Sequence, residues 1–253
     1  MASVEIEVLD TRAHANAAAA GGPDKRAYVR RIFSDIAPRY DMLNRILSLG
    51  IDRRWRRAAI AGLGWPRRPG GRYLDVCAGT LDVSGALVAT PGFSGQVIAA
   101  DFAEPMLRAG RGKGPSGRIG AVVADALTLP LPASCCDGAL VAFGIRNVAD
   151  LDTSLREVLR VLSPGSRFVI LELSTPSAPF LRGPYLAYFR HVLPVIGGVI
   201  SGHGSAYRYL PRSVMHFPEG AELAERMRSA GFVDVSWRPL TFGIAALHIG
   251  EKP

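Results

Sequence analysis

Three aspartates stand at the ends of three successive predicted strands. Asp75 lies near the end of the first apolar run, Asp101 closes the second and Asp125 follows the third. The carboxyl ends of parallel strands meet at one edge of a sheet, where α/β folds bind nucleotides. A carboxylate about twenty residues past the first strand's loop is placed to bind ribose hydroxyls. We therefore predict that Asp101 binds a ribose, Asp75 an ammonium or its ordered water, and Asp125 an adenine amino group, although each alone would also fit a helix cap or a solvated turn.

The turn after the first predicted strand contains a single glycine, Gly79, followed by Thr80. A dinucleotide site has three glycines there, so that the backbone can approach a pyrophosphate. Asp82 falls in the first turn of the following helix, where its negative charge would repel a phosphate. These features disfavour NAD and FAD. They predict a phosphate-free nucleoside with a cationic tail, which is S-adenosylmethionine.

Short apolar runs alternate with amphipathic segments along the chain. We expect strands over residues 73–76, 97–100, 119–123, 138–143 and 167–173, and helices over 81–88, 105–111, 151–162 and 218–230. This alternation predicts βαβ crossovers and a parallel sheet with helices on both faces. The last two runs, 233–238 and 244–249, have no room for a helix between them and should pair antiparallel. The predicted fold class is α/β, the Rossmann-like class I S-adenosylmethionine-dependent methyltransferase fold: a mostly parallel seven-stranded sheet with a C-terminal antiparallel hairpin, plus N-terminal helices.

The chain divides into a leader and one large domain. We expect residues 1–23 to be a loosely ordered leader and 24–253 to be the methyltransferase domain. Within it, 24–64 should form a helical cap that covers the sheet or roofs a substrate pocket, and 178–216 a substrate-side insertion. The stretch 185–200 fits an interfacial segment or a buried helix. No run is long enough to span a membrane, and acidic residues near the N-terminus argue against a signal peptide, so we expect a cytoplasmic protein.

The composition limits the kinds of partner. The net charge of +8 comes mostly from arginine, which fits RNA, an anionic bilayer or a genomic bias toward arginine. Four arginines in residues 53–57 could hold an amphipathic helix on anionic lipid. The cysteines, Cys77, Cys135 and Cys136, lack the spacing of a zinc site, and we expect buried thiols and no bound metal.

Stretches outside the nucleoside loop resemble one family. They read FSDIAPRYDMLN at 33–44, SLG at 48–50, RRW at 53–55, FGIRNV at 143–148, YRYLP at 207–211 and FP at 217–218. From about residue 24 to its end, the chain resembles the ubiquinone/menaquinone biosynthesis C-methyltransferases, which methylate the ring of a polyprenylated quinol precursor. The resemblance implies S-adenosylmethionine as cofactor. It implies a polyprenylated demethylmenaquinol or 2-methoxy-6-polyprenyl-benzoquinol as substrate.

The resemblance also assigns roles to individual positions. Beside Asp75 and Gly79, the implied cofactor-binding residues are Thr80, Asp101, Phe102, Asp125, Ala126 and Ala142. Those implied to line the quinol and its reacting carbon, taken as catalytic, are Tyr40, Arg146 and Asn147.

Two positions depart from the family pattern. Leu81 stands where the family usually has a second glycine, and a branched side chain is strained wherever φ is positive. We expect a slightly shifted loop that avoids this strain. Ala142 stands where the family often has a serine that contacts the cofactor. Both departures would weaken cofactor binding rather than change the fold.

Ring methylation requires an ionised hydroxyl to enrich the ring carbon in electrons. Arg146 stays protonated and cannot be the base. We predict that it stabilises the phenolate and orients a water that takes the proton, while Asn147 and Tyr40 position the ring. The alternative is a structural arginine paired with a strand-end aspartate.

Two other functions fit the sequence less well. An RNA methyltransferase would suit the arginines, but the fourth strand leads into Phe-Gly-Ile-Arg-Asn rather than an Asn/Asp-Pro-Pro-aromatic turn. A non-catalytic subunit of a quinone-biosynthesis complex would suit Leu81 and Ala142. We expect a quinol substrate, no nucleic acid, a possible homodimer and peripheral contact with the inner face of a membrane.

Overall fold

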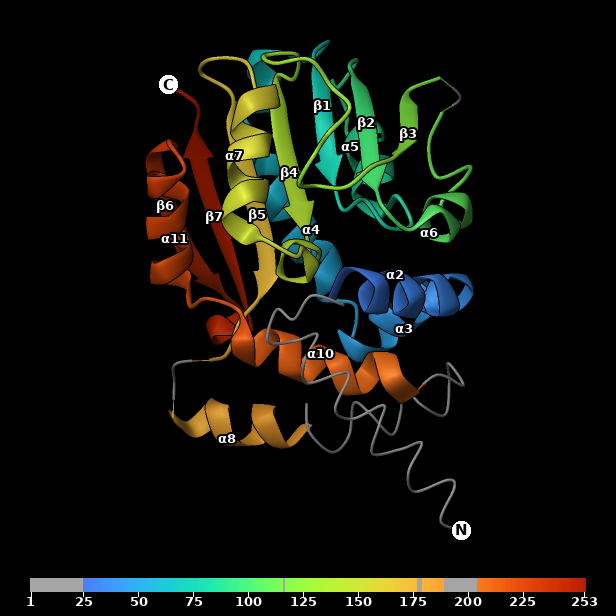
Figure 1. Ribbon diagram of the computed structural model, residues 1–253, viewed down its shortest axis with the longest axis vertical. Coiled ribbons are helices and arrows are strands. Elements are labelled where there is room, and N and C mark those ends of the chain that lie inside the picture. The colour runs from blue at the N-terminus through green and yellow to red at the C-terminus, as the bar shows by residue number, and fades with distance from the viewer. Residues whose placement is uncertain (1–24, 116, 177–178, 189–203) are drawn as a thin grey trace.

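A computed structural model of the chain describes residues 25–115, 117–176, 179–188 and 204–253 (Figure 1). The predicted leader lies outside the described residues, as do residues 189–200 of the predicted apolar stretch. No helix among the described residues is both long enough and apolar enough to cross a bilayer.

Seven strands form one sheet in the order β3-β2-β1-β4-β5-β7-β6. Their bounds are β1 Arg72–Val76, β2 Gln96–Asp101, β3 Ile119–Val123, β4 Gly138–Ala142, β5 Arg167–Leu173, β6 Val233–Leu240 and β7 Ala245–Glu251. The first five strands are parallel, and β7 runs antiparallel between β5 and β6. The predicted class I sheet is confirmed. Its strand order reverses between β1 and β4, the place where doubly wound folds bind ligands.

Helices cover both faces of the sheet, because its central strands β1, β4 and β5 are buried on both sides. The helices are α2 Lys25–Ile36, α3 Tyr40–Leu47, α4 Asp52–Gly62, α5 Asp82–Val88, α6 Glu104–Ala109, α7 Leu151–Val161, α8 Pro179–Ala187, α10 Gly204–His216 and α11 Gly220–Ser229. Short 3-10 turns lie at η1 Ala37–Arg39, η2 Trp65–Arg67, η3 Ile145–Asn147 and η5 Thr241–Gly243. Consecutive strand residues such as Tyr73 and Leu74 belong to different buried clusters, because successive side chains point to opposite faces of a sheet.

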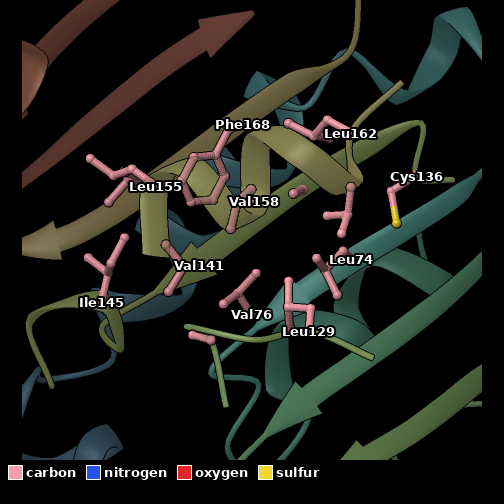
Figure 2. Close-up of a cluster of buried hydrophobic side chains, with 14 of the residues drawn as sticks. Leu74, Val76, Leu129, Cys136, Val141, Ile145, Leu155, Val158, Leu162 and Phe168 are labelled. Carbon is pink, nitrogen blue, oxygen red and sulfur yellow. The ribbon is translucent and has the colours of Figure 1, made fainter. Parts of the chain in front are cut away.

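Each face of the sheet has its own core. Helices α7 and α11 pack on one face, where Leu155 and Met227 belong to the same buried cluster as Leu74 and Phe168. Figure 2 shows Leu155 of α7 beside these strand residues. Helices α4 and α5 pack on the opposite face. The N-cap of α7 is Asp150, whose carboxylate accepts a hydrogen bond from the Thr153 amide. These two cores fix the positions of the strands' carboxyl ends relative to one another.

The N-terminal helices lie across the carboxyl ends of the strands (Figure 1). Helix α2 ends where Pro38 enters η1, and it contacts α6 and η3 on the sheet side and α10 on the other. Tyr28 of α2 and Tyr209 of α10 meet edge to face, with ring centroids 5.8 Å apart. Helix α4 packs its Trp55 side against the face of the sheet and does not lie across the strand ends. Helices α2, α3 and α10 therefore form the roof over the strand ends.

Candidate functional site

A cavity lies under this roof, at the carboxyl ends of the parallel strands. We call it the first cavity. The predicted site residues that line it are Tyr40, Gly79, Asp101, Phe102, Asp125, Ala126, Ala142 and Asn147. The other three predicted residues, Asp75, Thr80 and Arg146, are not among its lining residues. Most of the predicted cofactor residues thus converge on one space, although they come from four separate strand ends.

Asp101 ends β2 with its carboxylate held by two backbone amides. Its Oδ2 accepts a hydrogen bond from the Gly79 amide and its Oδ1 from the Ala103 amide, both at 2.8 Å. Burial raises the pKa of this carboxyl, and the same amide bonds act in the opposite direction. Each carboxylate oxygen keeps a second lone pair. Asp101 is therefore a fixed double acceptor, as a ribose diol requires.

Asp125 follows β3 and is held in a similar way. Its Oδ1 accepts a hydrogen bond from the Leu127 amide at 3.0 Å, and its Oδ2 lies 3.0 Å from Nε of Arg26. Among the described residues that line the first cavity, Arg26 is the only cation, and it is already paired with Asp125. The described lining of this cavity therefore has no unpaired cation that could bind a phosphate. These carboxylate acceptors fit a phosphate-free nucleoside.

The loop between β1 and α5 does not avoid strain at Leu81. This residue has φ of 63° and ψ of 21°, so the expectation of a shifted loop is wrong. Its side chain is buried with Ala99 and Leu107, away from the first cavity. Gly110 lies so close that an added Cβ would fall 2.5 Å from the Thr80 carbonyl oxygen. Burial of the leucine offsets the strain of the left-handed backbone, which is why the family's glycine is dispensable here.

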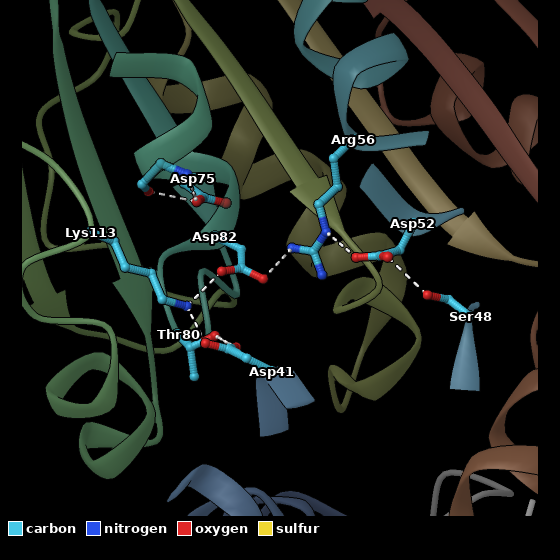
Figure 3. Close-up of polar contacts among 9 residues, drawn as sticks. Asp41, Ser48, Asp52, Arg56, Asp75, Thr80, Asp82 and Lys113 are labelled. Atoms are coloured by element: carbon cyan, nitrogen blue, oxygen red, sulfur yellow. Dashed lines mark hydrogen bonds and ion pairs between the residues drawn. The ribbon is translucent and has the colours of Figure 1, made fainter. Parts of the chain in front are cut away.

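Charged side chains tie the loop to the roof (Figure 3). The Thr80 hydroxyl donates to the Asp41 carboxylate of α3, which also forms a close ion pair with Lys113. Lys113 lies 2.5 Å from Asp82, and Arg56 of α4 lies 3.7 Å from it. The charge of Asp82 is therefore compensated, and its predicted repulsion of a phosphate is weak. The feature that still disfavours a phosphate is Arg26 of the first cavity, because its charge is already paired with Asp125.

Asp75 faces the start of α5 rather than a cavity. Its Oδ2 accepts hydrogen bonds from both the amide (3.1 Å) and the hydroxyl (2.6 Å) of Ser84. Burial raises the pKa of this carboxyl to about 7. In these contacts Asp75 fixes the first turn of α5 against β1. Its predicted bond to the cofactor's ammonium stays a prediction.

A second cavity adjoins the first, and Tyr40 and Phe143 line both. The lining of the second cavity is Tyr40, Asn44, Ser48, Asp52, Trp55, Arg56, Phe143, Arg146, Leu173, Leu210 and Ile244. Phe143 has φ of 62°, which ends β4 one residue earlier than predicted and turns the chain between the two cavities. Two molecules, one bound in each cavity, would therefore lie close together beside the rings of Tyr40 and Phe143.

Arg146 lines the second cavity and is paired with a residue that the sequence analysis missed. Its Nη1 donates to Glu172 Oε1 at 2.5 Å and to the Phe143 carbonyl oxygen at 2.6 Å. Both side chains are almost fully buried, with 5% of Arg146 and 2% of Glu172 exposed. The partner is a glutamate in β5, not the strand-end aspartate considered as the alternative. Its signal in the sequence was a single acid late in an otherwise apolar run.

Tyr40 lines both cavities, and Asn147 lines the first. Burial raises the pKa of the Tyr40 phenol, against the opposing effects of a hydrogen bond with Asn44 and the charge of Arg146. The side-chain oxygen of Asn147 is buried and has no hydrogen-bond partner among the described residues. A buried, unpaired acceptor in a cavity wall is costly unless a ligand donates to it. Both residues are therefore placed to contact a bound molecule.

Comparison with known proteins agrees with this geometry. The family model described as the ubiE/COQ5 methyltransferase family matches residues 23–252. This chain belongs to the ubiE/COQ5 methyltransferase family. It is 47% identical over 233 residues to the ubiquinone/menaquinone biosynthesis C-methyltransferase UbiE of Geobacter sulfurreducens, covering 90% of each chain. It is 46% identical over 225 residues to the demethylmenaquinone methyltransferase of Thermus thermophilus, covering 88% of this chain and all of that one.

A solved structure supports the fold. An S-adenosylmethionine-dependent methyltransferase from Thermotoga maritima, a possible histamine N-methyltransferase, superposes with a TM-score of 0.60 at 19% identity, covering 88% of this chain and 99% of that one. At this identity the likeness shows the fold alone. The predicted family, the class I fold, the C-methyltransferase activity and the cofactor S-adenosylmethionine are confirmed.

The first cavity fits this cofactor. S-adenosylmethionine supplies a methyl group on a positively charged sulfur. Asp101 and Asp125 offer acceptors for its ribose and adenine, and no unpaired cation among the described lining residues would repel its charged tail. Thr80 does not line this cavity, and its hydroxyl is bonded to Asp41. In this structure Thr80 connects the family's cofactor loop to the roof.

Proposed function

We propose that this methyltransferase adds a methyl group to a ring carbon of a polyprenylated quinol, either a demethylmenaquinol or a 2-methoxy-6-polyprenyl-benzoquinol, in menaquinone or ubiquinone biosynthesis. The observation that carries the proposal is the second cavity, which joins the first at Tyr40 and Phe143. Its apolar residues suit an aromatic ring and the start of an isoprenoid tail, and its polar residues suit ring hydroxyls. The names of the relatives favour a quinol over RNA.

Arg146 has the central electrostatic role in this proposal. Methylation at carbon proceeds when a ring hydroxyl loses its proton, and the resulting phenolate needs a nearby positive charge. Glu172 fixes Nη1 of the guanidinium, while Nη2 has no hydrogen bond among the described residues. That nitrogen is available to hold the phenolate or a water. Asn147 and Tyr40 then orient the ring toward the first cavity.

The substrate is tested by incubating the protein with labelled S-adenosylmethionine and each demethyl quinol, followed by chromatography of the extracted lipid. We expect label in the lipid with at least one quinol and none with RNA. Label in RNA, with the quinols unmethylated, would overturn the proposal.

The role of Arg146 is tested with Arg146→Lys, which keeps a positive charge opposite Glu172 but removes the planar fork. We expect kcat to fall by about 10²–10³-fold, as for the loss of one oxyanion donor, with little change in cofactor affinity by calorimetry. Arg156→Lys, on the exposed side of α7, is the matched control and should retain full activity. Unchanged turnover in Arg146→Lys would remove Arg146 from the mechanism.

We also propose contact with an anionic bilayer through one outer surface of α3 and α4. Met42, Ile46 and Leu49 are large apolar residues with 47%, 42% and 85% of their surface exposed. Arg53 and Arg54 are exposed at the start of α4, four and five positions after Leu49. Apolar and basic side chains together are typical of interfacial helices, and Asn44 and Ser48 of the same segment line the second cavity. A tail embedded in lipid would thus lie close to its ring site.

Vesicle flotation tests this contact. We expect more binding to vesicles containing phosphatidylglycerol than to pure phosphatidylcholine, and roughly tenfold or greater loss in Leu49→Glu, from the lost burial of one leucine. Val123→Glu on β3, where the valine is 56% exposed, is the matched control. Equal binding by both variants would contradict the assignment of this surface. The homodimer stays a prediction.

A further inference from the structure

One carboxylate in the second cavity has no role in the mechanism above. Asp52 lies in the first turn of α4, is 8% exposed and is the only acid among the described residues that line this cavity. The other charged or titratable groups facing the same space are Arg56 of α4, Tyr40 of α3 and Arg146 of η3. A proton acceptor for the quinol hydroxyl must come from this set.

Asp52 is held in a defined orientation from two sides (Figure 3). The Ser48 hydroxyl donates to Oδ1 at 2.8 Å, and Nε of Arg56 lies 3.3 Å from Oδ2. The same guanidinium extends to Asp82 at 3.7 Å, so it is shared between two acids. Each oxygen of Asp52 keeps acceptor capacity, since a carboxylate has about four lone-pair sites. The result is a positioned carboxylate that can accept one more proton donor.

The remaining acids near the two cavities are unsuited to this task. Glu172 is neutralised by Arg146 and does not line the second cavity. Asp101 and Asp125 line the first cavity, where backbone amides and Arg26 hold them. Asp52 is left as the acid that shares a cavity with Tyr40 and Arg146.

We propose that Asp52 is the general base that removes the proton from the ring hydroxyl, an inference that rests on the quinol methylation proposed above. The O–H bond breaks and its proton passes to Asp52, directly or through the water beside Arg146. The electron pair left on oxygen forms the new carbon–methyl bond through the ring, while the sulfur–methyl pair returns to sulfur. Loss of the ring C–H proton then restores aromaticity, and the phenolate recovers the proton from Asp52. One proton is released overall.

This assignment divides the chemistry between two oppositely charged groups. Arg146 stabilises the charge that develops on oxygen, and Asp52 accepts the proton whose loss creates it. Ser48 is a positioning residue, because it acts through the orientation of Asp52. Arg56 is also a positioning residue, because it too orients Asp52. Its guanidinium carbon lies over the Phe143 ring, 5.6 Å from the ring centroid.

The first test is the pH profile of Asp52→Asn, which preserves shape and the acceptor for Ser48. With a quinol that the native protein methylates, we expect kcat to fall about 10²–10⁴-fold at neutral pH, the usual contribution of a general base. Activity of the variant should rise about tenfold per pH unit toward the ionisation of a free phenol near pH 10, while the native profile stays flatter. A variant with the native pH slope, or with a change in KM alone, would overturn the assignment.

The second test measures protons rather than turnover. A nitro-substituted naphthol with a coloured anion serves as the probe, and calorimetry in buffers of different ionisation enthalpy counts the protons taken up when it binds. We expect about one proton for the native protein, because Asp52 and the bound phenolate cannot both keep a negative charge, and about none for Asp52→Asn. Equal uptake would overturn the assignment.

Two further variants separate the outcomes. Ser48→Ala should lower kcat less than Asp52→Asn and retain the native proton uptake. Asp152→Asn, an exposed acid paired with Arg226 on the far helices, should leave activity unchanged. If the native protein methylates no quinol, the proposed function fails whatever the probe shows. If it does and Asp52→Asn equals it in either test, only the role of Asp52 fails.

Discussion

The strained backbone at Leu81 predicts an unusual order of stability among variants of that residue. With φ of 63°, a residue bearing Cβ is disfavoured by roughly 1 kcal/mol relative to glycine. The side chain is 4% exposed, so Leu81→Ala should cost about 3 kcal/mol, within the range for buried leucines. Leu81→Gly loses the same contacts but relieves the strain. We expect it to be about 1 kcal/mol more stable than Leu81→Ala, although less stable than the native protein.

Urea unfolding followed by circular dichroism measures these differences, provided that the m-values agree. The control is Ala86→Gly, on the exposed side of α5, where glycine should instead cost about 1 kcal/mol. Because Leu81 does not line the first cavity, calorimetry should find little change in affinity for S-adenosylmethionine in either Leu81 variant. If Leu81→Gly is less stable than Leu81→Ala, as in an ordinary helix, the account of strain offset by burial is refuted.

Two predictions concern buried charges. Burial holds the folded-state pKa of Asp75 near 7, above its unfolded value of 3.8, so its stabilising contribution is complete below about pH 4 and is lost as the pH rises to about 7. This loss approaches about 4 kcal/mol. Asp75→Asn retains an acceptor for Ser84, and its free energy of unfolding should not show this loss. Urea titrations of the cofactor-free proteins from pH 4 to 8 measure both free energies, and a parallel fall in the two would disprove the prediction. Glu172→Gln leaves the Arg146 guanidinium buried without a counter-charge and should cost about 3–5 kcal/mol, most of it recovered in the double variant with Arg146→Met. Equal stability of Glu172→Gln and the native protein in thermal unfolding would contradict this.

Local sequence was sufficient for the elements and for the position of the site. Strand and helix periods are properties of neighbouring residues, so the predicted boundaries agree with the structure to within about two residues for most elements. Asp101 and Asp125 were found because parallel strands bring their carboxyl ends to one edge. The motifs around Tyr40 and Arg146 identified the family.

Contacts between distant segments needed the tertiary structure. Asp75 accepts two hydrogen bonds from Ser84 of α5, nine positions further along the chain, because the pleat turns its side chain toward that helix. The partner of Arg146 is 26 positions away in β5, and nothing local to either residue specifies that pairing.

The sequence by itself determined the fold class, the nucleoside edge of the sheet and the family, because these depend on short-range patterns. Only the tertiary structure decided that Leu81 keeps a left-handed backbone, since the burial that offsets the strain comes from β2 and α6. Likewise, only the packing of α4 against the sheet brings Asp52 into the same cavity as Arg146. The environment of a side chain depends on several segments that pack together and exclude water, so the sequence of one segment does not specify it.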